Sequence, residues 1–556
     1  MDKKTILAIV LSMVVIMIWQ SMFAPPAKKR VPTEEPAEKR VTEISREEGS
    51  TEERAIGVEE GETEVRDVMV ETPLYRAIFT TEGGGLKSWK LKEYKDRVKT
   101  VVLWRRKEVE EPRPVEMIGV QSADGLPLAT EFEGEGTEGR NVVFEADRGE
   151  LLLEERDEGS ITFIARLGGG VDIVKRYRFH GSEYRVDLDV EVINRGTADV
   201  NPEMSLSWYG MVGRASRYTF AGPSVFSETG VERLKTKEVQ KGKEFKDGIK
   251  WMADENNYFV SLIAPRKMDD VTVDVREMEG IESGKGLGFE SRMTFYKGQV
   301  APGERVESSF LIYVGPKLPE LLKGLEVEAE KAINFGKYLG SIEKVLLWFL
   351  ELAHDVTGNY GVAIIILSIL LKVIFWPLSR RSYRSMQEMQ KVQPEMKMLQ
   401  EKYKEDKQRL NQEMMALYKR RKVSPVGGCL PMLVQFPFLI ALYKALPLSF
   451  NLRHAPFVLW LRDLSAADTF FVDQLALPLL GNTPVGPLPL LMGVSMLIQQ
   501  KMSPTMGDPR QAKMMMIMPV MFIFIFLNFP SGLVLYWFVQ NLLTIGEQYL
   551  TKRGRS

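Results

Sequence analysis

The hydrophobic pattern divides the 556-residue chain into two chemically different halves. From about residue 67 to 317 apolar and polar positions alternate with a period of two, as in "YRVDLDVEVINRG" (184–196), and Gly-containing turns separate these stretches. Many short alternating strands of this kind predict a large antiparallel β-sandwich. From about residue 357 onward the chain contains long apolar runs, which instead predict membrane-spanning helices.

Six apolar runs predict six membrane spans, so the chain is expected to be a polytopic, multidomain membrane protein. The first run, Thr5–Phe23, follows Lys3 and Lys4 and lacks a small-residue cleavage site, so residues 1–23 are predicted to be an uncleaved signal anchor. The other five runs lie in a core of residues 358–550. They cover residues 360–378, 428–447, 486–500, 514–529 and 532–550.

Two segments connect the anchor, the β-domain and the core. Residues 24–66 carry twelve Glu and eight Lys or Arg with no aromatic residue, a composition that predicts a disordered linker. Residues 318–357 turn helical, and an apolar stripe between 342 and 353 predicts an amphipathic helix in the membrane surface. A packed connecting helix is the alternative. The polar side of this helix is expected to hold Glu343, Lys344 and Glu351.

Short-loop charge predicts the orientation of the chain. Residues 380–422 hold thirteen Lys and Arg against six Asp and Glu, and residues 551–556 form a short basic tail. The loop 448–485, by contrast, contains only two Arg and no Lys. We therefore expect both termini and the basic loop to be cytoplasmic, with the β-domain on the other side.

The basic loop reads as two polar helices that form a cytoplasmic hairpin. Its excess of positive charge is suited to lipid headgroups, a ribosomal surface or an acidic protein. The alternative is that these charges act only as an orientation signal. The candidate contact residues are Arg380, Arg381, Arg384, Lys419, Arg420 and Arg421.

Lys372 lies inside the first core span, eight residues before Arg380. At about 1.5 Å of rise per residue it is roughly 12 Å from the cytoplasmic end of the span. A charge at that depth costs roughly 2.5–3.5 kcal/mol. Polar residues of other spans gather at a similar depth, so we predict one shared hydrophilic cavity, open to the cytoplasm and closed to the outside. The residues of other spans are Gln435, Ser495, Gln499, Asn541 and Thr544, and Ser368 lies one turn before Lys372 on the same face of its own span.

Structural roles for these polar side chains stay open. Lys372 can snorkel to the interface or form a structural ion pair, although side chains lean toward the helix N-terminus, which for this span means away from the cytoplasm. For Gln435 or Asn541 taken alone, a hydrogen bond between helices accounts for the residue equally well.

Several classes of chemistry have no signal in the sequence. The single cysteine, Cys429, excludes a disulfide within the chain, and the three histidines lack ligand spacing. No phosphate-binding loop, HExxH or GxSxG motif is present, and Ser368 with Lys372 would need an oxyanion site that no motif supplies. We expect no enzyme activity, cofactor or metal. A solute transporter or channel is the rival class, but it predicts polar residues in both leaflets and often a repeat.

Five segments resemble the YidC/Oxa/Alb family of membrane protein insertases. They are "GNYGVAIIILSILLKVIFWPLSRRSYRSM", "KVSPVGGCLPMLVQFPFLIALY", "APFVLWLRDLSAADTFF", "MGVSMLIQQKMSP" and "FPSGLVLYWFVQNLLTIGEQYL". The resemblance covers about residues 335–550, and the anchor with a large outer domain resembles the form found in bacteria with two membranes. It implies a periplasmic β-supersandwich, an inner-membrane location, and five spans around a hydrophilic groove with the hairpin at its mouth.

The resemblance also implies roles for individual residues. Most family members have an arginine where this chain has Lys372; lysine keeps the charge but lacks the planar fork of a guanidinium. The pair Tyr536–Trp537 stands where two tyrosines are common. We expect Lys372 and the polar residues to hold the acidic flank of a nascent segment, which then leaves along an apolar slide. The slide residues are Leu439, Leu442, Phe522 and Phe526.

The partners implied are nascent membrane proteins, the Sec translocon (SecYEG and SecDF) and membrane lipids, with the ribosome and the signal-recognition-particle receptor as further candidates. No nucleic-acid readout and no nucleotide requirement are expected.

Overall fold

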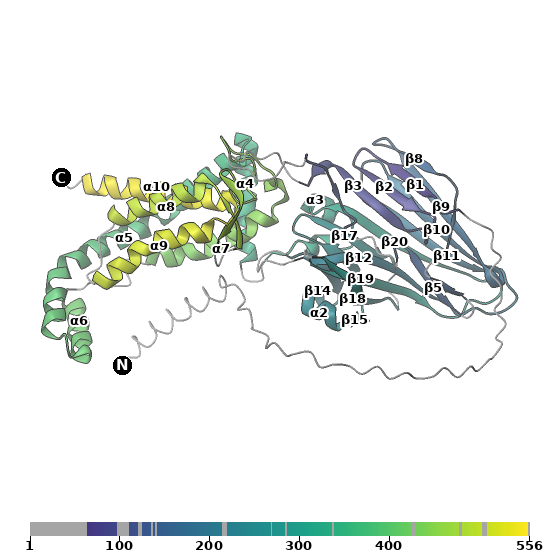
Figure 1. The fold of residues 1–556 in the computed structure, drawn as a ribbon, viewed down its shortest axis with the longest axis horizontal. Coiled ribbons are helices and arrows are strands. Elements are labelled where there is room, and N and C mark those ends of the chain that lie inside the picture. The colour runs from purple at the N-terminus through teal and green to yellow at the C-terminus, as the bar shows by residue number, and fades with distance from the viewer. Residues whose placement is uncertain are drawn as a thin grey trace, which may run out of the picture.

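The computed structural model describes most of the chain after the predicted linker. The described residues are 64–96, 111–119, 125–134, 137–139, 142–213, 220–267, 270–283, 286–335, 339–421, 423, 430–477, 481–502 and 509–553. The predicted signal anchor and almost all of the predicted linker lie outside them. Figure 1 shows a β-rich domain at one end of the molecule and a helical bundle at the other.

The described part of the β-rich domain contains three sheets. The five-stranded sheet has the order β4 (Pro114–Glu116), β3 (Leu86–Lys95), β2 (Tyr75–Thr80), β1 (Asp67–Glu71), β8 (Glu150–Leu152). The nine-stranded sheet has the order β14 (Gly230–Arg233), β13 (Gly222–Ser227), β16 (Trp251–Glu255), β17 (Phe259–Pro265), β20 (Arg305–Pro316), β11 (Arg185–Asn194), β10 (Val171–His180), β9 (Glu158–Leu167), β7 (Glu145–Ala146). The six-stranded sheet has the order β15 (Lys243–Phe245), β18 (Thr272–Ser283), β19 (Gly286–Lys297), β12 (Glu203–Gly213), β5 (Thr130–Gly134), β6 (Thr137–Gly139).

The strand pairings in these sheets are antiparallel, except that β1 and β8 run parallel. One hydrophobic core joins side chains from all three sheets. Short helical turns connect the strands or follow them. They are η1 (Gly168–Gly170), α2 (Thr236–Lys241), α3 (Pro319–Lys323) and η2 (Ala329–Ala332).

In strand β11 the alternation of apolar and polar residues does not predict which side chains are buried. The apolar positions predicted to face the core are buried: Val186, Leu188, Val190 and Val192. The acidic residues between them are buried as well, because arginines cover them. The pairs are Asp187 with Arg185 and Arg266, Asp189 with Arg178, and Glu191 with Arg305. Burial alone would raise the pKa of Asp187, but hydrogen bonds from Arg185, Arg266 and His180 outweigh it and hold that pKa below its ordinary value.

A single buried lysine links the three sheets. Lys175 on β10 is completely buried, and its Nζ donates hydrogen bonds to the carbonyl oxygens of Gly83 at 3.2 Å, Gly84 at 3.0 Å and Leu128 at 2.6 Å. The two glycines have φ of 65° and 57° in the turn between β2 and β3, a conformation that favours glycine. Leu128 precedes β5. Burial lowers the pKa of Lys175 well below its ordinary value.

The helical part follows the β-rich domain in the chain. Its helices are α4 (Gly340–Thr357), α5 (Tyr360–Lys402), α6 (Lys407–Arg421), α7 (Leu430–Leu448), η3 (Phe450–Leu452), α8 (Pro487–Met502), α9 (Pro509–Phe526) and α10 (Ser531–Arg553). A two-stranded sheet, β21 (Val472–Leu477) with β22 (Gly481–Val485), lies between α7 and α8. Helix α5 is 43 residues long and continues without a break from the first core span into the hairpin.

Among the described residues, α5 alone has both the length and the hydropathy of a membrane-crossing helix. The apolar stretches Leu433–Leu448 and Ile517–Phe526 are shorter than that criterion requires. The number of membrane crossings therefore stays a prediction.

The prediction for α4 was wrong at one position. Lys344 and Glu351 are exposed, but Glu343 is completely buried, because the face containing it packs on α5 and α7. Its Oε1 lies 3.9 Å from Nζ of Lys444 on α7. The exposed side of α4 instead carries an apolar stripe, formed by Val345, Trp348, Leu352 and Val356. One side of α4 thus packs as a connecting helix does, and the other is suited to a membrane surface.

Aromatic contacts join the two parts of the molecule. The Phe450 ring of η3 lies 5.0 Å from Tyr94 and 5.6 Å from Phe259 of the β-domain, measured between ring centroids. The Arg453 guanidinium lies 5.0 Å from the Phe259 ring centroid and donates to the backbone oxygen of Lys95. These contacts hold the C-terminal end of α7 against the β-domain.

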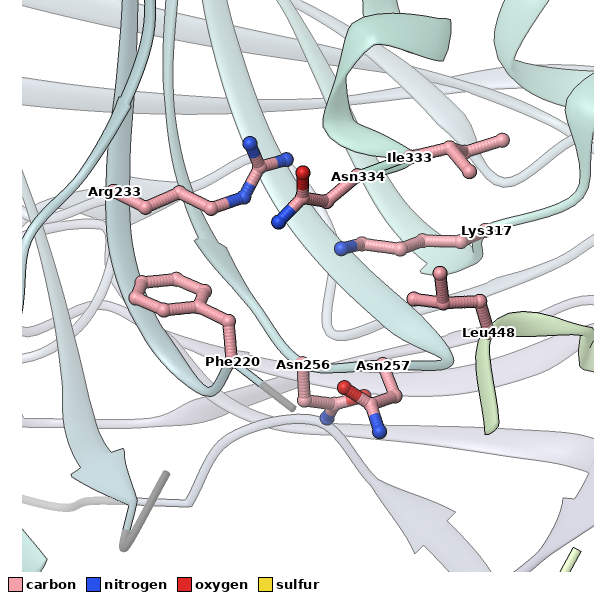
Figure 2. A pocket seen from close by; sticks show the side chains of 8 residues that line it. All are labelled: Phe220, Arg233, Asn256, Asn257, Lys317, Ile333, Asn334 and Leu448. Atoms are coloured by element: carbon pink, nitrogen blue, oxygen red, sulfur yellow. The ribbon is translucent and has the colours of Figure 1, made fainter. Parts of the chain in front are cut away.

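A small pocket lies at this junction. Figure 2 shows Arg233 and Lys317 pointing into it from the β-domain and Leu448 approaching from the end of α7. Both cations already pair with Glu255, and both donate to the carbonyl oxygen of Ala332. The pocket is therefore lined by cations that already have partners, and these contacts join β14, β16 and the segment after β20.

Replacing Lys175 with methionine should destabilise the β-domain. Methionine keeps the unbranched apolar stem but lacks the ammonium group, so three buried carbonyl oxygens lose this donor, at a cost of about 3–5 kcal/mol. Thermal unfolding of the detergent-solubilised chain measures the effect. The exposed lysine of α2 gives the matched control, Lys237→Met, which should unfold like the parent chain. Equal unfolding temperatures for both variants would contradict a structural role for Lys175.

The stability of the β-domain should fall as pH rises from about 4 to 7, through Asp254. This residue of β16 lies against β12, where a Cβ added at Gly210 would come within 2.4 Å of its Oδ2. Burial raises the pKa of Asp254 to about 7, and the neighbouring Glu255 acts in the same direction. A pKa raised in the folded state means that the folded chain binds the proton more tightly, so the stabilisation is complete below the unfolded value and is lost as pH approaches 7.

Asp254→Asn should remove this slope, which we expect to be about 1 kcal/mol or less per pH unit. Unfolding temperatures between pH 4.5 and 8 measure it, with exposed Asp247→Asn as the control that keeps the parental slope. A slope that persists in Asp254→Asn would assign the pH dependence to another group.

Candidate functional site

Helix α10 organises the polar part of the bundle. It packs against α5, α7 and α8. Its polar side chains recur at helical spacing, and their partners lie on all three of these helices. The polar stripe of α10 consists of Tyr536, Gln540, Asn541, Thr544 and Glu547.

Lys372 of α5 contacts two members of this stripe. Its Nζ donates a hydrogen bond to Thr544 Oγ1 at 2.9 Å and lies 2.8 Å from Glu547 Oε2. The side chains of Lys372 and Glu547 are 17% and 18% exposed. The lysine therefore reaches sideways to α10, and the ion pair that the sequence left open is formed.

The same pair of helices makes a second polar contact. Gln540 Nε2 donates to the backbone oxygen of Ser368 at 2.8 Å. Both this contact and the one between Lys372 and Thr544 join residues 172 positions apart. Because one offset fits two contacts a turn apart, α5 and α10 run parallel in a fixed register.

Two further pairs join residues that were predicted to share one site. Gln435 Nε2 of α7 donates to Tyr536 Oη at 3.1 Å. Asn541 Nδ2 donates to Ser495 Oγ of α8 at 3.0 Å. Each is a hydrogen bond between helices, which is the structural role that the sequence left open for Gln435 and Asn541. Tyr536 lies eight residues before Thr544, about 12 Å along α10, so Gln435 does not lie level with Lys372 as the sequence predicted.

The remaining predicted site residues lie on the same helices. The Ser368 hydroxyl is fully buried and donates to the carbonyl oxygen of Ile364 in its own helix. Gln499 is half-buried on α8, one turn after Ser495. Trp537 turns toward the apolar side of the bundle, where its ring lies 5.1 Å from Phe526 and 5.8 Å from Phe522.

The four predicted slide residues belong to one hydrophobic cluster of the bundle. Leu442 and Phe526 are buried, and Leu439 and Phe522 are half-buried against their neighbours. The exposed apolar residues of α9 lie elsewhere on that helix; they are Ile517, Val520, Met521 and Phe524. The sequence did not single out this exposed face.

The basic hairpin is built from the second part of α5 and from α6. Four apolar residues hold the two helices together: Met389, Val392, Met396 and Leu417. The six predicted contact residues, Arg380, Arg381, Arg384, Lys419, Arg420 and Arg421, are all exposed, although Arg421 also pairs with Glu395. The hairpin thus presents a cationic surface next to the inner end of the bundle.

Glu547 is the site residue that the sequence patterns did not bring forward. A usable signal was present, because Glu547 is the only acidic residue in the five predicted core spans. A lysine at the depth of Lys372 calls for an opposite charge on another span, and Glu547 is the one candidate in these runs. Within the described residues, no group of three or more His, Cys, Asp or Glu could hold a metal ion.

Comparison with known proteins gives the chain a family context. Residues 67–349 match the family model described as "YidC periplasmic domain", and residues 352–556 match "60Kd inner membrane protein". The chain is 36% identical over 576 residues to a membrane protein insertase YidC of Syntrophus aciditrophicus and 38% identical over 566 residues to one of Pelobacter propionicus. Each comparison covers 99% of this chain and 99% of the relative.

Among solved structures, an active YidC insertase with its first transmembrane domain resolved is similar to this chain. It shares 19% sequence identity, covers 87% of this chain and 92% of its own, and gives a TM-score of 0.37.

Proposed function

The chain belongs to the YidC family of membrane protein insertases, and we propose that it inserts nascent proteins into the bacterial inner membrane and assists their folding there. The structural observation that carries the proposal is Lys372, an only partly exposed cation that contacts Thr544 and Glu547 inside the helical bundle. Such a group inside a span serves a substrate path more often than it serves stability.

In this proposal the chain crosses the membrane six times. The anchor (1–23) and five core helices span it, both termini and the hairpin (380–422) are cytoplasmic, and the β-domain (67–317) is a periplasmic β-sandwich of the supersandwich type. The connector (318–357) would place the exposed apolar stripe of α4 in the outer membrane surface.

Insertion begins at the cationic hairpin in this mechanism. The exposed Arg380, Arg381 and Arg384 attract the acidic flank of a nascent segment at the inner membrane surface. The flank then reaches Lys372, and Gln435, Tyr536, Ser495 and Asn541 offer hydrogen bonds in place of water. Gln435 pairs with Tyr536 and Asn541 with Ser495, so these four side chains have hydrogen-bond partners while no substrate is present.

Burial of the apolar segment in lipid supplies the driving force. An apolar 20-residue segment favours insertion by several kcal/mol, against a cost of a few kcal/mol for a short charged flank, so no nucleotide is needed. The half-buried Leu439 and Phe522 and the exposed apolar face of α9 offer the departing segment a surface continuous with lipid.

Membrane lipids and nascent membrane proteins are the partners that this mechanism requires. The Sec translocon (SecYEG and SecDF), the ribosome and the signal-recognition-particle receptor remain proposals that follow from the family. The rival function, a solute transporter or channel, predicts polar residues through both leaflets. The contacts of Lys372 with Thr544 and Glu547, by contrast, lie in the half of α10 that is predicted to be cytoplasmic.

Lys372→Ala should lower insertion of substrates with an acidic flank by about tenfold, the effect of losing one charge-assisted contact. Lys372→Arg should retain most of the activity. The measurement is protease protection of a small single-span protein in ATP-free proteoliposomes. A matched protein with a neutral flank is the control and should lose much less. Undiminished insertion of the acidic protein by Lys372→Ala would remove the assigned role.

Neutralising the hairpin should slow substrate capture. The triple change Arg380→Gln, Arg381→Gln and Arg384→Gln is expected to reduce the initial insertion rate by roughly three- to tenfold at low salt and to flatten its salt dependence. The control has the same charge change on the β-domain, at the exposed residues Arg156, Lys237 and Lys241. If both triple variants have the parental rate and salt dependence, the hairpin charges act only in orientation.

A further inference from the structure

The ammonium group of Lys372 already has a carboxylate partner in this chain. Glu547 Oε2 lies 2.8 Å from Lys372 Nζ, and each side chain is less than one-fifth exposed. A substrate's acidic flank would bring the same chemical group to the same place. Glu547 and an incoming Asp or Glu therefore compete for one cation, and this competition has consequences for which substrates are held.

We propose that Glu547 is a built-in placeholder for the substrate carboxylate, and that it determines how strongly the chain discriminates acidic flanks from neutral ones. The inference rests on the proposed function, in which Lys372 receives the flank. Between substrates Glu547 keeps the lysine paired. When an acidic flank arrives, its carboxylate replaces that of Glu547, and the lysine passes from one ion pair to another of the same type.

The geometry allows this exchange without leaving the cation unpaired. Thr544 Oγ1 accepts from Lys372 Nζ at 2.9 Å, and its own proton is donated to the carbonyl oxygen of Gln540 at 2.7 Å. The threonine oxygen is thus oriented as an acceptor toward the lysine. It remains a partner of the ammonium while one carboxylate leaves and another enters, so the full desolvation cost of a bare ammonium is avoided.

The displaced glutamate also has somewhere to go. Glu547 lies six residues before Arg553, the end of α10, which is about 9 Å along the helix axis. Because helical side chains lean toward the helix N-terminus, the displaced carboxylate would move sideways around α10. Glycine at position 546 leaves the adjoining surface of α10 open, because a Cβ placed there would contact nothing within 4 Å.

Specificity follows from the balance of the exchange. A neutral flank cannot take the place of a carboxylate on Lys372, so it gains nothing from that cation. An acidic flank gains one ion pair and breaks another, so it is held only weakly and is released when Glu547 returns. Without the placeholder, the same flank would meet an uncompensated cation and would be preferred more strongly.

The test compares two versions of a single-span protein, one with Asp and one with Asn in its short translocated flank. The full chain is reconstituted in liposomes, and the readout is the ratio of insertion rates, acidic over neutral. Glu547→Gln keeps the shape of the side chain and removes its charge. We expect the ratio to rise about three- to tenfold, the range that corresponds to removing one partly exposed competing ion pair.

Two further variants make the result specific. Glu547→Asp retracts the carboxylate by one methylene group and should give an intermediate ratio, which covers the case in which Glu547→Gln disturbs folding. Glu155→Gln makes the same charge change at an exposed position of the β-domain and should leave the ratio at the parental value. Unfolding temperatures of all variants are measured in parallel.

The outcomes separate this inference from the function on which it rests. If Lys372→Met abolishes the acidic preference while Glu547→Gln leaves it at the parental value, Lys372 receives the flank but Glu547 is no placeholder. If Glu547→Gln lowers the preference as Lys372→Met does, Glu547 only positions the lysine, and the inference is overturned. If Lys372→Met keeps the parental preference, the assigned role of Lys372 fails first.

Discussion

A charge placed between membrane helices has to be compensated by other parts of the chain, and this constraint sets the arrangement of the bundle. Lys372 meets it through Thr544 and Glu547, both on α10. The register that these contacts impose on α5 and α10 is the one in which Gln540 reaches the backbone of Ser368. From the same helix, Tyr536 and Asn541 meet Gln435 and Ser495. The last helix of the bundle thus carries partners for three others.

Pairs of this kind serve an insertase better than an open charged cavity would. Polar groups that satisfy one another cost little while no substrate is present, and each pair can be exchanged for an equivalent contact with a substrate. The bundle can therefore be nearly dry between substrates and hydrophilic when a flank enters. These contacts do not require a permanently hydrated cavity.

Sequence patterns predicted much of the architecture and little of the pairing. Apolar runs marked the stretches that became α5 and α7 to α10, because hydrophobicity along one helix is a local property. Predicted depth placed Lys372 beside Thr544 and near Asn541, but it was wrong for Gln435, whose partner Tyr536 lies about 12 Å from Thr544 along α10. The contacts between these residues depend on how each helix is rotated and aligned against its neighbours. The contacting residues are up to 172 positions apart, and the pattern within one helix does not predict that alignment.

Two departures from simple hydrophobic patterning have the same physical origin. Glu343 was assigned to the polar side of its helix because charged residues are expected to face water, yet α4 packs on two helices and buries it toward Lys444. The acids of β11 likewise look solvated in the alternating pattern, but arginines from β10, from β20 and from the end of β17 cover them. In both cases a partner distant in sequence offsets the cost of burying a charge.

The distribution of contacts also determines at which end the helices of the bundle can separate at the lower cost. At its outer end, Phe450 and Arg453 bind α7 to the β-domain, and Glu343 with Lys444 binds α7 to α4. Around Lys372, the polar contacts between α5 and α10 are hydrogen bonds and one ion pair, which the substrate flank of the proposed mechanism would replace in kind. Separating the helices there exchanges polar partners, whereas separating them at the outer end would expose packed aromatic and aliphatic side chains. In the proposed mechanism, a flank that enters from the cytoplasm would reach the end of the bundle that opens at the lower cost, while the contacts with the β-domain hold the other end together.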